Sequence, residues 1–319
     1  MKKIFIVLIA FSFLSSFSQN ENFTFSQLDY VNTPIYKQIK KHPENYRYLD
    51  SVELFRIQYL SEDLKITGLM AAPKIDGKFP VIIYNRGGNR NYGQLLVSSA
   101  TDILSPIAAR GYVVVASNYR GNGGSDGKEE FGGSDVTDVV NLAKNVGTFH
   151  KADTSRIGLL GISRGGMMNY LVLKHAHDFG LNIKCAIAIG GIVDLEKTIE
   201  HHSEIGTVCE EIIPNYSANK IAEQQKRSAI FWTQELPKNI PLLILHSYDD
   251  AAVAYEQIPP FIDSLEKYNV NYKHIAYKKD NHGIVKHQLH VKEQINYWLD
   301  NYLKSSNTAT VINTNEIVD

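Results

Sequence analysis

A strand-turn-helix motif constrains this chain more than any other stretch. An apolar run from Ile157 to Ile162 is typical of a short buried strand, and the proline-free segment that begins at Arg164 is typical of a helix. Between them the sequence reads Gly-Ile-Ser-Arg-Gly, with Ser163 at the turn. In this context Gly-x-Ser-x-Gly places a serine hydroxyl on a sharp bend at the carboxyl edge of a parallel sheet. The motif therefore predicts an α/β fold with a nucleophilic serine at position 163.

A second match to the same pattern lies between Gly123 and Gly127, with Ser125 at its centre. It belongs to a glycine-rich polar stretch, and no helical pattern begins at Gly127, so we interpret it as a loop. The helix that follows Ser163 makes the difference between the two. Its first turn offers unpaired backbone N–H groups and a partial positive charge, which favour an oxyanion developing beside the serine.

Apolar strands alternate with helical segments along most of the chain. The expected strands span residues 79–84, 112–117, 157–162, 183–189, 241–245 and 270–277, after a hairpin within 51–73. The expected helices cover about 97–110, a segment that Ser134 or Asp135 caps, a segment from 164, and residues 256–268 and 286–303. Because the strands are continuously apolar and alternate with helices, we expect an α/β fold with a mostly parallel central sheet and helices on both faces.

The segment 193–235 interrupts this alternation and is longer than a simple crossover needs. Two interpretations stay open for it, a lid over the site and a plain helical insert. Residues 19–50 are expected to form an N-terminal extension, and residues 51–304 to form the catalytic domain. The tail 305–319 has no clear periodicity and is expected to be a mobile terminus.

The first residues are typical of a secretory signal peptide. Lys2 and Lys3 precede an apolar core from Ile4 to Leu14, and small residues follow, with cleavage expected after Ser18. The core is short for a membrane span, so an uncleaved anchor is the weaker interpretation. We therefore expect residues 1–18 to direct export to a periplasm or beyond, with no membrane association after cleavage.

Composition and metal-ligand residues exclude several other classes. The net charge of −1 comes without a basic patch, which argues against nucleic-acid binding. Cys185 and Cys209 could pair in an exported protein, but Cys185 lies in an apolar run, so a buried free thiol is equally expected. His201, His202 and Glu204 form a polar cluster without the spacing of a zinc site. We expect neither a metal nor a cofactor.

A serine hydroxyl needs an imidazole to accept its proton and a carboxylate to orient that imidazole. On this fold the acid and then the histidine follow the serine in the sequence. The strand at 241–245 leads to two candidate acids, Asp249 and Asp250, and His282 lies in the loop before the last helix. Other histidines fit less well. His274 lies within an expected strand, His246 at a strand end, and His287 and His290 on the last expected helix.

An oxyanion hole needs two hydrogen-bond donors. One is expected to be the backbone N–H of Arg164, directly after the nucleophile. The second is expected to be a backbone N–H of Arg86, Gly87 or Gly88, in the loop after the strand that ends at Tyr84. The side chain of Arg86 is an alternative donor.

Several of these segments resemble the catalytic domain of prolyl oligopeptidase-type serine peptidases, within the α/β-hydrolase superfamily. The segments are NRGGN, NYRGNGGSDG, EEFGGSDVTDV, GISRGG, RSAIFW followed by PLLILHSYDD, and NHG. The resemblance covers roughly residues 50–304. The acid motif of the family, His-Gly-x-x-Asp-x-x-Val, selects Asp250 over Asp249, although Ser247 stands where the family has glycine. The resemblance therefore implies a triad of Ser163, Asp250 and His282.

The resemblance also implies hydrolysis of peptide bonds through an acyl-enzyme. Family members that cleave oligopeptides often carry a β-propeller of several hundred residues, and this chain has no room for one. Selectivity then comes from the segment 193–235, comes from a partner subunit, or is weak. A carboxylesterase acting on small acyl esters, including those of polysaccharides, is the alternative. A non-catalytic binding protein on the same fold would have a broken triad, whereas the triad residues are all present.

Overall fold

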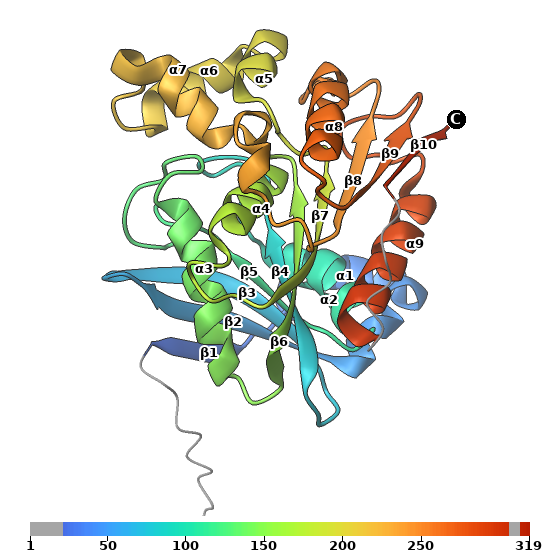
Figure 1. The fold of residues 1–319 in the computed structure, drawn as a ribbon. Helices are drawn as coiled ribbons and strands as arrows, with labels where there is room; N and C mark the ends of the chain where they lie inside the picture. Colours follow the sequence, from blue (N-terminus) through green and yellow to red (C-terminus); the bar gives the residue numbers. More distant parts are fainter. Residues whose placement is uncertain (1–21, 306–312) are drawn as a thin grey trace, which may run out of the picture.

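The computed structural model describes residues 22–305 and 313–319 (Figure 1). These residues form a ten-stranded sheet in the order β1-β2-β3-β5-β4-β6-β7-β8-β9-β10. The pairs β1/β2, β2/β3 and β3/β5 are antiparallel and the other neighbours are parallel, which confirms the mostly parallel sheet. The strands are β1 (Phe23–Gln27), β2 (Val52–Ser61), β3 (Leu64–Pro73), β4 (Phe79–Asn85), β5 (Val113–Ser117), β6 (Ala152–Ile162), β7 (Ile183–Ile189), β8 (Leu242–Ser247), β9 (Tyr272–Tyr277) and β10 (Thr314–Val318).

Helices cover both faces of the sheet, as predicted (Figure 1). The α-helices are α1 (Pro34–Lys41), α2 (Ser105–Ala108), α3 (Asp135–Asn145), α4 (Arg164–His175), α5 (Leu195–His201), α6 (Glu204–Ile212), α7 (Tyr216–Arg227), α8 (Ile258–Lys267) and α9 (Gln288–Leu299). Short 3₁₀ or π-helical segments are η1 (Pro43–Ser51), η2 (Ser99–Leu104), η3 (Val146–Thr148), η4 (Ala229–Phe231), η5 (Thr233–Glu235), η6 (Tyr255–Gln257) and η7 (Asp300–Lys304).

Successive side chains of each strand point to opposite faces, so the sheet separates two hydrophobic cores. In β4, Val81 and Ile83 pack into the core that contains residues of α3, α4 and α8. Ile82 and Tyr84 of the same strand pack into the core that contains residues of α2 and α9. Burial on both faces explains why the strands read as continuous apolar runs in the sequence.

The N-terminal extension takes part in the sheet. β1 pairs antiparallel with β2, with Phe23 opposite Tyr59. β2 and β3 form the predicted hairpin, from Val52 opposite Pro73 to Ser61 opposite Leu64. No specific role was predicted for the extension from its sequence. In the structure, its strand β1 forms one edge of the sheet.

Two helix starts differ from the prediction. In place of one helix at 97–110, wide π-helical turns (η2) precede the short α2, because Pro106 has no N–H to continue the α-helical ladder. At α3, neither Ser134 nor Asp135 caps the helix with its side chain in the predicted way. The Glu130 carboxylate instead accepts hydrogen bonds from the backbone N–H and the hydroxyl of Ser134, both at 2.8 Å.

The C-terminal residues correct the expectation of a mobile terminus at 305–319. β10 pairs in parallel with β9, with Thr314 opposite Lys273 and Val318 opposite Tyr277. An ion pair of 2.6 Å between Lys278 and Asp319 supports the pairing. Residues 306–312 and the expected signal peptide at 1–18 lie outside the described residues. Within the described part of the chain, no helix is long and apolar enough to cross a membrane.

The segment 193–235 folds into α5, α6, α7 and two 3₁₀ turns. These helices lie beyond the carboxyl ends of the parallel strands, at the top of Figure 1. Cys209 on α6 and Cys185 on β7 are both buried and free, so the disulfide interpretation is wrong. Burial raises the pKa of Cys209 to about 11, which keeps this thiol protonated at neutral pH.

Candidate active site

Ser163 lies on the bend between β6 and α4, as predicted. Its backbone has φ 58° and ψ −125°, a strained conformation for a residue with a side chain. The Ser163 N–H donates a 2.8 Å hydrogen bond to the Ile189 carbonyl, which holds the bend against β7. A Cβ at Gly161 would overlap the Gly165 carbonyl, and a Cβ at Gly165 would overlap the Asn85 carbonyl. Both glycines of the motif are therefore required by close backbone contacts.

Gly165→Ala is expected to destabilise the fold by about 1–3 kcal/mol, because the added methyl group forces the bend away from β4. Urea unfolding followed by circular dichroism measures this change. Gly147→Ala is the matched control, since a Cβ there would meet only the Thr154 side chain, at 3.3 Å. Equal stability of the two variants would contradict this account of the bend.

The structure brings Asp250 and His282 together. His282 Nδ1 lies 2.7 Å from Asp250 Oδ2. The other oxygen, Asp250 Oδ1, accepts backbone N–H bonds from Ala252 and Val253, each at 2.8 Å. Asp249 is exposed and instead accepts a 2.8 Å bond from the Lys279 N–H. Of the two candidate acids, only Asp250 contacts the histidine.

A second histidine contacts the same carboxylate. His246 Nε2 lies 3.3 Å from Asp250 Oδ2 and 2.9 Å from the Val253 carbonyl, and His246 is fully buried. Burial alone would raise the pKa of Asp250, but hydrogen bonds from His246 and His282 outweigh it and hold the pKa well below its ordinary value. Asp250 is therefore ionised at neutral pH. The sequence places His246 only as a competing histidine at a strand end and does not predict this contact.

The loop that carries His282 is tied to the end of β8. The Ser247 hydroxyl donates a 2.6 Å bond to the Asp280 carbonyl and accepts one from the Asp249 N–H at 3.2 Å. The Asp280 carboxylate accepts from the Asn281 N–H at 2.8 Å and lies 2.7 Å from His287 Nδ1. Ser247, which replaces the glycine of the family motif, therefore links the segment of the acid to the segment of the histidine.

The loop after β4 passes directly beside the nucleophile. A Cβ at Gly87 would lie 3.1 Å from the Ser163 Cβ and 3.0 Å from the Ile162 carbonyl oxygen. Within the described residues, no hydrogen bond uses the backbone N–H groups of Gly87, Gly88 or Arg164. These groups remain available to an anion at the serine, and their role as oxyanion donors stays a prediction.

The side chain of Arg86 does not belong to the site. Its guanidinium is buried and donates to the Asn118 carbonyl through Nη2 at 2.9 Å and through Nε at 3.2 Å. It also lies over the Tyr119 ring, with Cζ 5.0 Å from the ring centroid. The alternative in which this side chain donates to the oxyanion is wrong, because its donors are committed to the interior.

The side chain of Arg164 is also buried, which the sequence did not predict. It forms ion pairs with Glu129 and Asp135, and its Nη1 donates a 3.1 Å bond to the Gly88 carbonyl. Burial lowers the pKa of Arg164 to about 9, so the guanidinium is charged at neutral pH. The acidic partners lie in the EEFGGSD segment, whose acidic residues were the only sequence signal for this network.

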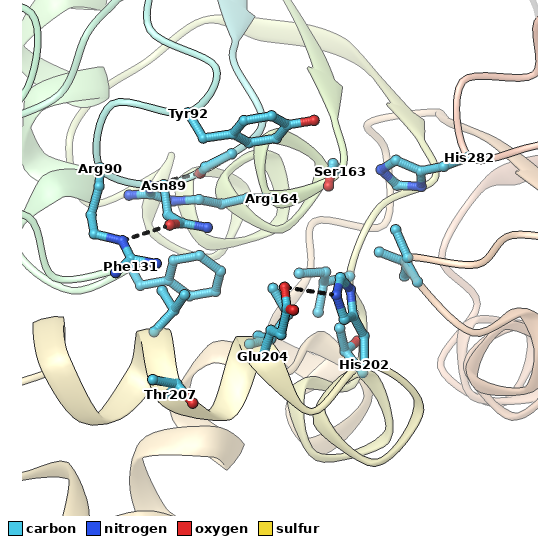
Figure 2. A pocket seen from close by; sticks show the side chains of 17 residues that line it. Asn89, Arg90, Tyr92, Phe131, Ser163, Arg164, His202, Glu204, Thr207 and His282 are labelled. Atoms are coloured by element: carbon cyan, nitrogen blue, oxygen red, sulfur yellow. Dashed lines mark hydrogen bonds and ion pairs between the residues drawn. The ribbon is translucent and has the colours of Figure 1, made fainter.

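A cavity of about 610 Å³ opens in front of the serine (Figure 2). Figure 2 shows the ring of His282 pointing toward Ser163 at one side of this cavity. The insert supplies much of its wall through α5, α6 and the turn between them: Thr198, His202, Glu204, Ile205, Thr207 and Val208. Helices α5 and α6 of the insert therefore line the site, whereas α7 contributes no residue to the cavity wall. Among the described residues, no group of three or more His, Cys, Asp or Glu side chains is placed to hold a metal ion.

A largely parallel sheet, a serine on a strand-turn-helix bend, and an acid and a histidine after later strands define an α/β hydrolase. Residues 98–306 match the sequence model of the prolyl oligopeptidase family. The chain belongs to this family and is an enzyme of the serine-peptidase type.

Three similar proteins illustrate the relationship. The uncharacterized peptidase YtmA of Bacillus subtilis is 26% identical over 258 residues, which are 78% of this chain and 94% of that protein. The acylaminoacyl peptidase of Pyrococcus horikoshii superposes with a TM-score of 0.70 at 24% identity, over 84% of this chain and 45% of that one. Esterase B of Lactobacillus rhamnosis gives a TM-score of 0.63 at 15% identity, over 85% of this chain and 94% of the esterase. The chain thus spans less than half of the acylaminoacyl peptidase.

Proposed function

We propose that this protein hydrolyses peptide bonds through an acyl-enzyme at Ser163, with His282 as general base and then general acid, and Asp250 as the group that orients His282. The observation that carries the proposal is the 2.7 Å contact between His282 Nδ1 and Asp250 Oδ2 in the cavity that Ser163 lines. An ionised carboxylate at Nδ1 keeps the proton there and leaves Nε2 free to accept the serine proton.

The reaction then proceeds in two steps, acylation and deacylation of Ser163. Ser163 Oγ forms a bond to the substrate carbonyl carbon while its proton moves to His282 Nε2. The resulting oxyanion is stabilised by the N–H of Arg164 and by an N–H of the loop at Gly87 and Gly88. The carbon–nitrogen bond breaks as the imidazolium protonates the leaving amine. A water molecule then bonds to the acyl carbon while His282 takes its proton, and the bond from that carbon to Ser163 Oγ breaks as His282 returns the proton to the serine.

Covalent labelling tests this proposal directly. A fluorophosphonate is expected to modify Ser163 and no other serine, as peptide mass spectrometry will show. Turnover is then measured with an aminoacyl- or prolyl-anilide and with a short-chain acyl ester. Comparable rates on both support peptide hydrolysis, whereas no labelling of the intact enzyme would refute the nucleophile.

Hydrolysis of acyl esters is the second candidate function. An alkoxide leaves more readily than an amine, so an ester demands less of the proton that His282 donates. The cavity in front of the serine also admits a small acyl group, since its walls include the apolar side chains of Phe131, Ile192 and Val208. Turnover of the ester with no turnover of the anilide would favour this candidate.

Thr207→Trp is expected to discriminate against long acyl groups, because Thr207 is exposed and lines the cavity on α6. A bulky ring there shortens the cavity, so kcat/KM for an octanoyl ester is expected to fall about tenfold relative to that for an acetyl ester. Ala222→Trp, at an exposed site on α7 outside the cavity wall, is the matched control and is expected to leave the ratio unchanged. An unchanged ratio in Thr207→Trp would exclude the α6 wall from substrate selection.

We also propose that the protein is exported by residues 1–18. The support is the sequence pattern of two lysines, an apolar core and small residues. N-terminal sequencing of the protein from a periplasmic or extracellular fraction is expected to begin after Ser18. Recovery of the unprocessed chain from the cytoplasm would contradict export.

A further inference from the structure

The guanidinium of Arg164 is the centre of a buried polar network behind the nucleophile. It is paired with the carboxylates of Glu129 and Asp135, and it donates to the Gly88 carbonyl at 3.1 Å. Arg164 is 1% exposed, Asp135 is 0% exposed and Glu129 is 7% exposed. A buried charge is tolerated only when it is paired and hydrogen-bonded, so these contacts fix the position of the side chain.

Glu129 extends the network to the loop that follows β4. Its Oε1 contacts Arg164, and its Oε2 accepts a 2.6 Å hydrogen bond from the backbone N–H of Arg90. The Gly88 carbonyl is the other point at which the loop is held. The same guanidinium therefore holds the loop twice, once directly and once through a carboxylate.

Two aromatic rings contact the guanidinium of Arg164. Arg164 Cζ lies 5.0 Å from the ring centroid of Tyr119 and 4.9 Å from that of Phe131. The Tyr119 hydroxyl donates a 3.2 Å bond to the Arg86 carbonyl, at the start of the same loop. Segment 86–90 is thus bound at its first, middle and last residue to Arg164 or to groups that contact Arg164.

We propose that the Arg164 side chain, acting through Glu129, positions loop 86–90 so that its backbone N–H groups lie beside the Ser163 hydroxyl. Arg164 then has two separate tasks. Its own N–H is one oxyanion donor, and its side chain sets the place of the second. The inference rests on the proposed function, since the loop needs this placement only if an oxyanion forms at the serine.

The two donors belong to separate segments, the bend after β6 and the loop after β4. Oxyanion stabilisation depends on donors preorganised within hydrogen-bond distance of the position that the oxygen takes in the transition state. A small displacement of the loop therefore weakens transition-state binding and leaves substrate binding in the cavity largely unaltered. Loss of the clamp is expected to appear in kcat more than in KM.

Glu129→Gln tests the clamp with little change of volume. Both the Arg90 N–H and the Arg164 guanidinium are donors, so an amide, with one acceptor atom, loses one of the two contacts. We expect kcat for p-nitrophenyl acetate, counted per fluorophosphonate-titrated site, to fall about 10- to 100-fold, with KM within about threefold of wild type. The inhibition constant of an acyl trifluoromethyl ketone, whose bound form carries an oxyanion, is expected to rise by the same factor.

Asp138→Asn is the matched control, because it makes the same kind of change at another buried acid, on α3. Asp138 is a buried carboxylate that pairs with Arg120 at 2.9 Å. This variant is expected to lower the melting temperature without changing kcat per titrated site. Wild-type kcat in Glu129→Gln, or an equal loss in Asp138→Asn, would overturn the clamp.

If Glu129→Gln does not fold, Arg164→Lys carries the test. A single ammonium cannot reach both Glu129 and the Gly88 carbonyl in the geometry of the guanidinium fork, so the same loss of kcat is expected. Wild-type kcat in this variant also overturns the inference. Failure of the proposed function is recognised separately, because the wild-type enzyme itself would then resist the fluorophosphonate.

Discussion

Ser163→Ala is expected to lower kcat by about 10⁴- to 10⁶-fold and to abolish labelling by a fluorophosphonate. The variant removes the only atom that forms the acyl bond, while the backbone N–H groups of Gly87 and Arg164 remain. Residual turnover therefore measures what the oxyanion donors contribute alone. Because alanine tolerates the bend no better than serine, the fold of the variant is checked by its melting temperature. Initial rates on the most active chromogenic substrate give the loss.

Ser125→Ala is the control for this experiment, since Ser125 lies at the centre of the second Gly-x-Ser-x-Gly match. Its hydroxyl accepts a 3.0 Å bond from the Thr67 N–H and holds a loop to β3. We expect kcat within about threefold of wild type, with a modest loss of stability from the missing hydrogen bond. Retained activity in Ser163→Ala together with lost activity in Ser125→Ala would reverse the assignment.

The two serine motifs illustrate how much of the fold could be predicted from local sequence. An apolar run precedes Ser163 and a proline-free helical segment follows it, whereas Ser125 lies in a glycine-rich polar stretch with no helical pattern after it. The same reasoning gave the hairpin of β2 and β3 and the parallel strands, because residues buried on both faces form continuous apolar runs. Periodicity is a property of neighbours along the chain, so it is visible without the structure.

The edges of the sheet could not be predicted in this way. β10 pairs with β9 through its backbone, and its side chains are exposed or half-buried. An edge strand of this kind needs no apolar pattern, so its sequence does not differ from that of a loop. Its pairing also depends on residues about 40 positions earlier, such as Lys273 opposite Thr314, and this distance is beyond any local signal.

Some residues of the candidate site could likewise be predicted from local sequence, and others could not. The positions of Ser163 and His282 followed from the elements that precede them, but both Asp249 and Asp250 follow the same strand, and local sequence did not separate them. The burial of Arg164 was missed because its partners come from another segment: Glu129 lies 35 residues earlier. From local sequence an arginine is predicted to be exposed, because the carboxylates that would neutralise it in the interior are not known.

Asp250→Asn is expected to lower kcat/KM by about 10⁴-fold, because the new amide must turn its NH₂ group toward His282. The Oδ1 position faces two donors, the N–H groups of Ala252 and Val253, each at 2.8 Å. The amide oxygen therefore takes that position, and the NH₂ group takes the position 2.7 Å from His282 Nδ1. His282 must then accept at Nδ1 and carry its proton on Nε2, where it cannot take the proton of Ser163. Steady-state rates on the ester and the anilide measure the loss.

Asp249→Asn is the matched control, because the same chemical change is made one residue away. Asp249 Oδ2 accepts one bond, from the Lys279 N–H at 2.8 Å, and an amide oxygen serves there equally well. We expect kcat/KM within about threefold of wild type and little change in stability. A large loss in Asp249→Asn with little loss in Asp250→Asn would assign the acid to Asp249. Large losses in both would mean that the turn after β8 acts as one unit, because Ser247 and Asp249 help to hold the loop that carries His282.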